Sequence, residues 1–307
     1  MLKSTLWALI QLCSFCCEHF ILHKEGTHPC FFHSTGMTPS ESTERLFLQI
    51  LWDWLREWTS LLRSPCFPVL FSLSVYVGCC FPYICLDLLC SRLALVRRFK
   101  IQPQSKVTWE AAWRCLCKIS RNHVCFIFPL SVVHWYWKPV VSPPVAPAVL
   151  AVVKDVLACL LLFDTQYFFW HLLHHKVYWL YCFFHKEHHV YTATFSLTTE
   201  DTSVWEMLSL SFFTTLNPVL LDCHPLTEML FFIANIYLSV EAHSGYEFPW
   251  SPHRLVPFGL YGGARHHDLH HLKFKVNYAP YFTHWDRLFG TLHTQKKSRN
   301  TETLKRM

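Results

Sequence analysis

The sequence predicts an all-α, polytopic integral membrane protein with a histidine-rich site for two metal ions on its cytosolic side. Three observations predict this fold. Only 16% of the 307 residues are charged, whereas 52% are hydrophobic and 17% aromatic; soluble domains average about a quarter charged residues. Several apolar runs approach the roughly twenty residues that a helix needs to cross about 30 Å of hydrocarbon. Three copies of the pattern His-x-x-His-His lie between or after these runs.

Residues 1–44 are expected to be a variable N-terminal segment. Residues 6–22 are apolar, but Glu18 and His19 interrupt them and no small-residue cleavage site follows, which argues against a cleaved signal peptide. An interfacial helix and a first membrane span both remain open for this stretch. Residues 45–63 place apolar and aromatic side chains at three- and four-residue steps with charges between them. That pattern predicts an amphipathic helix on the membrane surface.

Five further apolar runs predict one membrane span followed by two helical hairpins. Pro82 inside the first run predicts a kink and not a helix end. A proline-rich turn joins the second run to the third, and the sequence Asp-Cys-His-Pro joins the fourth to the fifth. The five runs are 67–90, 123–137, about 148–170, 204–221 and 226–241.

The basic residues predict which side of the membrane each loop occupies. The hairpin turns are nearly free of Lys and Arg, whereas the loop before the first hairpin is rich in them, so this loop is expected to be cytosolic. Each hairpin returns the chain to the same side, so residues 171–203 and 242–307 are expected to be cytosolic too. We assign residues 45–293 to one membrane-embedded domain with a cytosolic catalytic cap, and 294–307 to a basic polar tail. The basic residues of the loop are Arg92, Arg97, Arg98, Lys100, Lys106, Arg114, Lys118 and Arg121.

Charged residues inside the third apolar run need an explanation, because a charge in the bilayer centre costs a few kcal/mol. Lys154 is expected at the lumenal end, where its long side chain reaches the interface. Asp164 lies seven residues before His171, hence on nearly the same helix face. Pairing with a neighbouring helix and a role near the histidines both remain open for Asp164.

The fifteen cysteines do not predict a disulfide framework. Most of them lie inside apolar runs, where a thiol behaves as a small hydrophobic side chain. Cys13 and Cys16 have the spacing of a metal or redox pair, but no second pair accompanies them, so no site is assigned there.

The three His-x-x-His-His triplets are the strongest chemical signal in the sequence. On a helix, positions i, i+3 and i+4 share one face, so each triplet is expected to direct its imidazoles to a common point. About a tenth of one such match is expected by chance at this histidine content, so three matches are not coincidental. The triplets are His171, His174 and His175; His185, His188 and His189; and His267, His270 and His271.

So many imidazoles predict two transition-metal ions. Imidazole suits iron, copper, zinc and nickel, and the triplets lack the oxygen ligands that calcium and magnesium prefer. Structural zinc takes about four ligands, so at least eight histidines are too many for one ion. A redox pair of irons fits better than zinc for hydrolysis, which would need fewer ligands and an evident general base. The side chains considered for orienting the metal-bound rings are Asp164, Glu187, Glu200, Asp201, Asp268, His284 and Asp286.

The sequence around the triplets resembles the fatty acid hydroxylase and sterol oxidase superfamily, whose members are integral membrane enzymes with three histidine boxes. The likeness covers roughly residues 45–293. Between the boxes, the sequence resembles the branch of this superfamily that hydroxylates the side chain of cholesterol. The stretches with this resemblance are FDTQYFFWHLLHHKVYWLY, CHPLT, VEAHSGYEFPWSPHRLVPFGLYGGARHHDLHH and NYAPYFTHWDRLFGTL.

The resemblance implies a non-haem diiron monooxygenase of the endoplasmic reticulum membrane. Such an enzyme uses dioxygen, with electrons from a reductase or a cytochrome b5-type donor and NAD(P)H, to convert cholesterol to 25-hydroxycholesterol. His243 matches the further histidine that the family places between boxes two and three, and His174 remains a possible ligand. Ala242 stands where close relatives would carry an acidic residue that could orient His243. The metal ligands that the resemblance implies are His171, His175, His185, His188, His189, His243, His267, His270 and His271.

Two other interpretations stay open from the sequence. The same boxes serve related diiron methyl oxidases and desaturases that act on other sterols or on fatty-acyl lipids. A sterol-binding protein without activity would keep the histidines for metal-dependent folding. Such a protein would purify with zinc, and its effect in cells would survive the loss of a box histidine such as His270.

Overall fold

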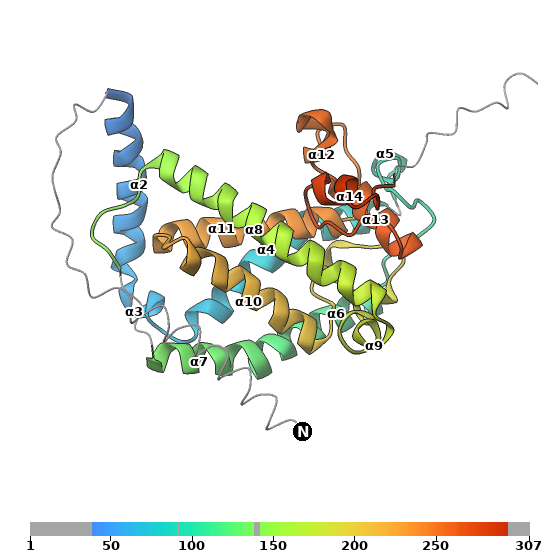
Figure 1. Cartoon of the computed structure of the whole chain (residues 1–307), viewed down its shortest axis with the longest axis horizontal. Helices are drawn as coiled ribbons and strands as arrows, with labels where there is room; N and C mark the ends of the chain where they lie inside the picture. Colours follow the sequence, from blue (N-terminus) through green and yellow to red (C-terminus); the bar gives the residue numbers. More distant parts are fainter. Residues whose placement is uncertain (1–38, 91, 138–141, 294–307) are drawn as a thin grey trace, which may run out of the picture. The chain divides into compact units, whose positions relative to one another are not determined.

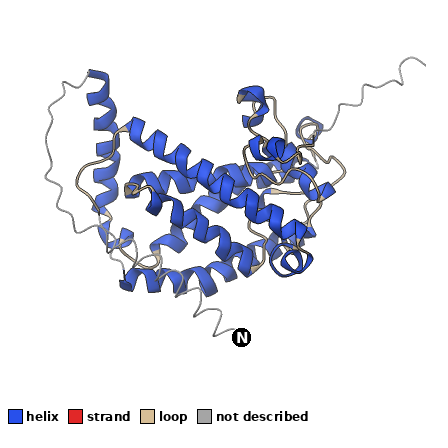
Figure 2. Ribbon diagram, in the orientation of Figure 1, coloured by secondary structure: helices blue, strands red, loops and turns tan. Residues whose placement is uncertain are grey.

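The structure is a computed structural model that describes residues 39–90, 92–137 and 142–293, with side chains from residue 47 onward. The described residues form helices and connecting loops, with no β-sheet among them (Figure 2). Two isolated bridges join Lys100 to Tyr246 and Tyr261 to Phe282. The all-α prediction is confirmed, while the candidate pair Cys13 and Cys16 lies outside the described residues.

Eight longer helices and several short turns make up the described chain. The longer helices are α2 (Pro39–Glu57), α4 (Phe67–Cys90), α6 (Trp109–Asn122), α7 (Phe128–Trp137), α8 (Val149–Lys176), α10 (Val204–Leu220), α11 (Pro225–His243) and α13 (Gly263–Lys273). The short ones are α3 (Thr59–Leu62), α5 (Ala94–Arg97), η1 (His123–Ile127), α9 (Tyr178–Leu180), η2 (Tyr181–His185), η3 (His188–Val190), η4 (Ser196–Thr198), α12 (Pro252–Leu255), η5 (Pro257–Gly259) and α14 (His284–Leu288).

The amphipathic segment expected at 45–63 is helical in the structure, but it is divided at Trp58 into α2 and α3. On the buried side, Trp52 is 1% exposed and its indole N–H donates to the carbonyl of Pro143 at 2.7 Å. On the opposite side, Phe47 and Trp54 are exposed. Large apolar side chains on both sides of a helix fit a place between protein and lipid better than a purely aqueous one.

The run expected at 123–137 is part of a longer helical stretch that begins at Trp109. Helix α6 passes through the π-helical turn η1 directly into α7. The hydroxyl of Thr108 caps the start by accepting from the backbone N–H of Ala111 at 3.2 Å. The helix continues because no Gly or Pro lies between Trp109 and Phe128.

One described helix, α4, is long and apolar enough to cross a membrane by length and composition. The other expected spans do not meet that criterion on their own. Helix α10 has only 17 residues, and α8 contains Lys154, Asp155 and Asp164 among its apolar residues. The number of spans therefore stays a prediction.

Helix α11 packs against α4, α8 and α10, and α13 packs against α11 (Figure 1). One buried cluster joins Tyr76 of α4 to Ile119 of α6 and Val240 of α11. A second joins Phe163 of α8 to Phe231 of α11 and to the C-terminal segment. This packing brings the C-terminal ends of α8 and α11 beside α13, and all three contain box histidines.

Candidate metal centre

Nine buried or half-buried histidines converge in the described structure and form two groups. Within each group, the candidate ligand atoms all lie within 4.8 Å of one another. The five-histidine group consists of His171, His175, His185, His189 and His270. The four-histidine group consists of His188, His243, His267 and His271.

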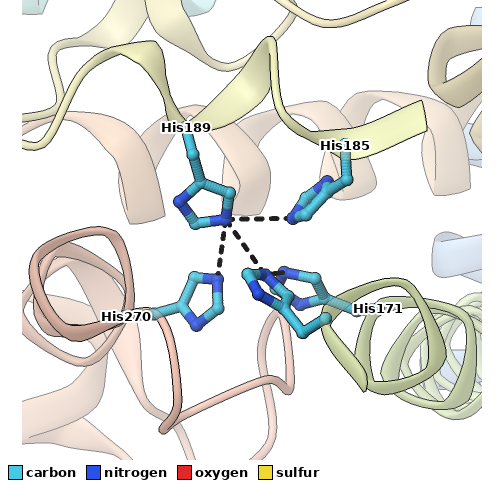
Figure 3. A group of neighbouring side chains, drawn as sticks. His171, His185, His189 and His270 are labelled. Atoms are coloured by element: carbon cyan, nitrogen blue, oxygen red, sulfur yellow. Dashed lines mark hydrogen bonds between the residues drawn. The ribbon is translucent and has the colours of Figure 1, made fainter. Parts of the chain in front are cut away.

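In both groups the rings face each other through their Nε2 atoms. In the five-histidine group, His189 Nε2 lies 3.1 Å from His175 Nε2, 3.0 Å from His185 Nε2 and 3.1 Å from His270 Nε2. Figure 3 shows that the labelled rings reach this point from three separate parts of the chain. In the four-histidine group the Nε2 distances are 3.1 Å for His188 to His243, 2.9 Å for His243 to His267 and 3.1 Å for His267 to His271.

The outward ring nitrogens decide what these Nε2 atoms can bind. A carbonyl oxygen can only accept a hydrogen bond. A ring whose Nδ1 contacts a carbonyl oxygen therefore has its proton on Nδ1 and directs the lone pair of Nε2 towards the centre of its group. These lone pairs converge with the Nε2 atoms of the other rings in each group, so the residues fit a bound metal. The Nδ1 contacts to carbonyls are His171 to Tyr278 at 2.6 Å, His243 to Ser239 at 2.8 Å, His270 to Val276 at 2.7 Å and His271 to Tyr191 at 3.1 Å.

The nitrogen spacing also bears on the kind of metal. With metal–nitrogen bonds of about 2.1 Å, ligands at right angles lie about 3.0 Å apart, whereas tetrahedral ligands lie about 3.4 Å apart. The shortest spacings in both groups, 2.9 to 3.2 Å, match right-angle neighbours. The convergence of five and four ring nitrogens fits one transition-metal ion in each group.

Metal binding requires neutral imidazoles. Burial lowers the pKa of His185, His188, His267 and His271, with neighbouring histidines adding to the effect. These rings are therefore neutral at physiological pH, in the state in which they bind a metal.

Box one lies on the last two turns of α8, and one of its histidines is turned away from the groups. His171 and His175 are one turn apart and share a face. His174 belongs to neither group: its Nδ1 contacts the carbonyl of Trp170 at 2.6 Å and its ring stacks on the Trp170 indole. The structure therefore separates the possible ligand His174 from the other two histidines of its box.

Boxes two and three each supply both groups, which differs from the expectation that a triplet points to one place. His185 and His189 enter the five-histidine group, whereas His188 enters the other. The cause in box two is local, because His185 ends the π-helical turn η2 and His188 begins the 3-10 turn η3. In box three, the neighbours His270 and His271 are about 100° apart around α13 and so face different groups.

The carboxylates named from the sequence do not contact the nine histidines. Asp164 accepts from the backbone N–H groups of Tyr281 and Phe282, so it fastens the C-terminal segment to α8. Asp286 accepts from the N–H groups of Tyr278 and Ala279 and so acts on His171 only indirectly, through the Tyr278 carbonyl. The other side chains considered for this role have the following contacts: Glu187 and Asp201 pair with Lys118, Glu200 lies near His123, Asp268 accepts from Gln102, and the His284 ring packs on Phe282 and Trp285.

One carboxylate that no sequence pattern singles out, Glu206, contacts a histidine of the five-histidine group. Its Oε1 lies 2.9 Å from Nδ1 of His185, and both side chains are fully buried. The residue stands in the first turn of α10, where a glutamate is common for helix stability alone. Its place before an apolar helix and shortly after box two therefore did not distinguish it from an ordinary N-terminal glutamate.

The comparisons with known proteins show the family of this chain. The fatty acid hydroxylase family matches residues 156–291, which include all nine histidines and Glu206. A cholesterol 25-hydroxylase-like protein of Danio rerio is 61% identical over 246 residues, covering 80% of this chain and 98% of that relative. The chain belongs to the cholesterol 25-hydroxylase branch of the fatty acid hydroxylase family.

Mammalian members of this branch are similar over the same part of the chain. The cholesterol 25-hydroxylase of Homo sapiens is 54% identical over 253 residues, which cover 82% of this chain and 93% of that protein. The cholesterol 25-hydroxylase of Rattus norvegicus is 51% identical over 257 residues, which cover 84% of this chain and 86% of that protein. No solved structure matches the chain.

In this member of the cholesterol 25-hydroxylase branch, a cavity lies beside the four-histidine group. This cavity of about 50 Å³ is lined by His188, His243 and His267 of the four-histidine group, together with Glu206 and Ala242. The alanine at position 242 does not leave His243 without a partner, because Nδ1 of the His243 ring contacts the backbone carbonyl of Ser239. The effect of alanine here is on the cavity wall and not on the orientation of the ring.

Proposed function

We propose that this protein is a sterol monooxygenase that hydroxylates the side chain of cholesterol to give 25-hydroxycholesterol. The observation with most weight is the pair of buried imidazole groups, with a cavity beside the four-histidine group. It occurs in a chain that is 51 to 61% identical to relatives named for this reaction. The carbon to be oxidised has no acidic proton, so acid–base side chains alone cannot do this chemistry, and a redox metal centre can.

The five-histidine group would hold one iron ion and the four-histidine group the other. When bound, the iron pair supplies the electrons and Lewis acidity for using dioxygen. The chain holds five of the nine rings in place through outward contacts of Nδ1, four to backbone carbonyls and one to Glu206. The cavity beside His188, His243 and His267 has room for a small molecule such as water or dioxygen. Phe163 and Leu210 supply apolar side chains to its wall.

We further propose that the protein spans the endoplasmic reticulum membrane several times, with the histidine boxes and the C-terminus in the cytosol. Helices α4, α7, α8, α10 and α11 would form the embedded part. Support comes from the large apolar side chains that α8 leaves exposed, among them Leu150, Leu157 and Leu161. A stripe of this kind along one helix needs a non-aqueous neighbour.

Electrons would come from a reductase or a cytochrome b5-type donor that draws on NAD(P)H. The basic loop expected on the cytosolic side has exposed cationic side chains at Arg92, Arg98, Lys106 and Arg114. A surface of this charge fits an acidic donor, because charge complementarity speeds encounter.

The test is to express the chain in membranes, supply cholesterol, reductant and ¹⁸O-labelled dioxygen, and analyse the sterols by mass spectrometry. The expected product contains one labelled oxygen on the cholesterol side chain. A new double bond or an oxidised ring methyl group would assign the protein to a desaturase or a methyl oxidase instead. No labelled sterol from iron-loaded protein would overturn the proposal.

A further inference from the structure

We propose that Glu206 is a positioning residue that the five-histidine group needs in order to hold its metal ion. The inference rests on the proposed function, and it names a residue and a selective effect that the two histidine groups alone do not imply. Glu206 lies outside all three histidine boxes and cannot itself be a ligand through the oxygen that contacts His185.

The contact between Glu206 and His185 differs from those of the other outward nitrogens. His171, His243, His270 and His271 place Nδ1 on backbone carbonyls, whereas His185 places it 2.9 Å from a carboxylate oxygen. Among the described residues, no other carboxylate contacts one of the nine histidines. A carboxylate acceptor fixes the ring and its tautomer and also makes Nε2 a stronger ligand.

Glu206 also borders the space beside the four-histidine group. Its second oxygen, Oε2, is buried and has no hydrogen-bond partner among the described residues, and the residue lines the cavity together with His188, His243 and His267. An unsatisfied buried oxygen is costly. A small hydrogen-bond donor in the cavity, such as water, would satisfy it and would link Glu206 to the open side of the four-histidine group.

The local fold holds Glu206 and His185 in register. The backbone N–H of Glu206 donates to the hydroxyl of Ser203 at 3.1 Å, and this hydroxyl donates to the carbonyl of Phe184 at 2.5 Å. Phe184 belongs to η2, the turn that ends at His185. The first turn of α10 is thus fastened to the turn with the metal-facing ring, so the carboxylate and the imidazole cannot move independently.

The experiment compares iron content and Mössbauer spectra of the purified full-length chain with those of three variants. Glu206→Leu removes the acceptor at similar size, and it is expected to lower the content from two irons per chain to about one. Glu206→Gln keeps an oxygen that can accept from His185. This variant is expected to bind the second iron, but roughly 10- to 100-fold more weakly than the wild-type chain. Asp87→Asn is the matched control for a buried carboxylate, because Asp87 pairs with Lys100 and Tyr246 and contacts none of the nine histidines; it should keep two irons.

Each outcome decides the matter. Two irons with wild-type affinity and spectra in Glu206→Leu would overturn the inference. If Glu206→Leu does not fold, Glu206→Gln decides: weakened binding of one iron supports the positioning role, and unchanged binding of both overturns it. Absence of iron from the wild-type chain under the same loading conditions would overturn the proposed function itself, which separates the two failures.

Discussion

His171 and His174 lie three residues apart on the same helix, and both are buried, but only His171 faces a metal group. Its Nδ1 contacts the Tyr278 carbonyl and its Nε2 lies 3.2 Å from Nε2 of His175. His174 instead stacks on Trp170. The difference comes from the 3.6-residue repeat of α8, and it gives a test in which two equally conservative changes have opposite outcomes.

His171→Gln is expected to lose one iron and to lower hydroxylation at least 100-fold, because an amide cannot replace an imidazole ligand at this position. His174→Gln is expected to keep both irons and to stay within about fivefold of wild-type activity, since the His174 ring contacts none of the nine metal-facing histidines. The prediction is checked by measuring the iron content of both purified variants and the amount of hydroxylated sterol that each produces. Equal loss of iron in the two variants would show that His174 is a ligand.

Ala242 allows a test of the cavity that leaves the ligands unchanged. Its side chain is buried and forms part of the cavity wall next to His243. Ala242→Leu adds a branched group that fills this small space, and we expect at least a tenfold lower kcat with iron content unchanged. Ala242→Ser, which is similar in size to alanine, is the control. Wild-type turnover in the leucine variant would mean that the reaction does not use this cavity.

At the residue scale, much of the site could be predicted from sequence, and one part could not. The nine histidines named from spacing and resemblance are the nine that the structure brings together. Their division into groups depends on η2, η3 and the rotation of α13, which spacing alone does not reveal. Glu206 was missed because a single glutamate in a first helical turn has an ordinary explanation.

Among the elements, the loop before α14 shows how a segment without regular structure can be made rigid. Asp286 in α14 accepts from the backbone N–H groups of Tyr278 and Ala279 and from the Thr291 hydroxyl. Burial alone would raise the pKa of Asp286, but nearby His266 and these donors stabilise the charged form and hold the pKa below its usual value of 3.8. The loop is thereby fixed where the Tyr278 carbonyl contacts His171.

Asp286→Asn is expected to destabilise the metal-free protein by about 2 kcal/mol at pH 7, because an amide loses acceptors for buried N–H donors. The folded-state pKa of Asp286 is lowered, so its stabilisation is present above pH 4 and is lost as the pH falls through the folded pKa. The difference between variant and wild type should therefore shrink at pH 3. Thermal unfolding in detergent at both pH values measures it, and a constant difference would argue against an ionised Asp286.

The helices themselves followed the sequence closely where apolar runs had clear ends. The runs expected at 204–221 and 226–241 correspond to α10 and α11, because Ser203 and the His224-Pro225 pair mark their starts. The run at 123–137 was placed too narrowly, since the amphipathic residues before it continue the same helix. Resemblance and hydropathy describe the apolar part of such a helix and not its polar extension.

For the whole molecule, the predicted topology places the two ends of α4 on opposite sides of the membrane. Cys66 precedes α4 and Cys117 lies on α6 in the basic region, and both thiols are exposed. In sealed microsomes, a membrane-impermeant maleimide should modify Cys117 from outside and reach Cys66 only after detergent is added. Peptide mass spectrometry identifies the modified cysteine. Equal labelling of both without detergent would contradict a membrane-spanning α4.

The central claim is that the two histidine groups hold two iron ions, and metal analysis of the purified full-length chain tests it most directly. Protein from iron-supplemented cells, extracted in detergent and measured by inductively coupled plasma mass spectrometry, is expected to contain two irons per chain and little zinc. A single zinc per chain, with no iron bound after anaerobic loading, would contradict the account.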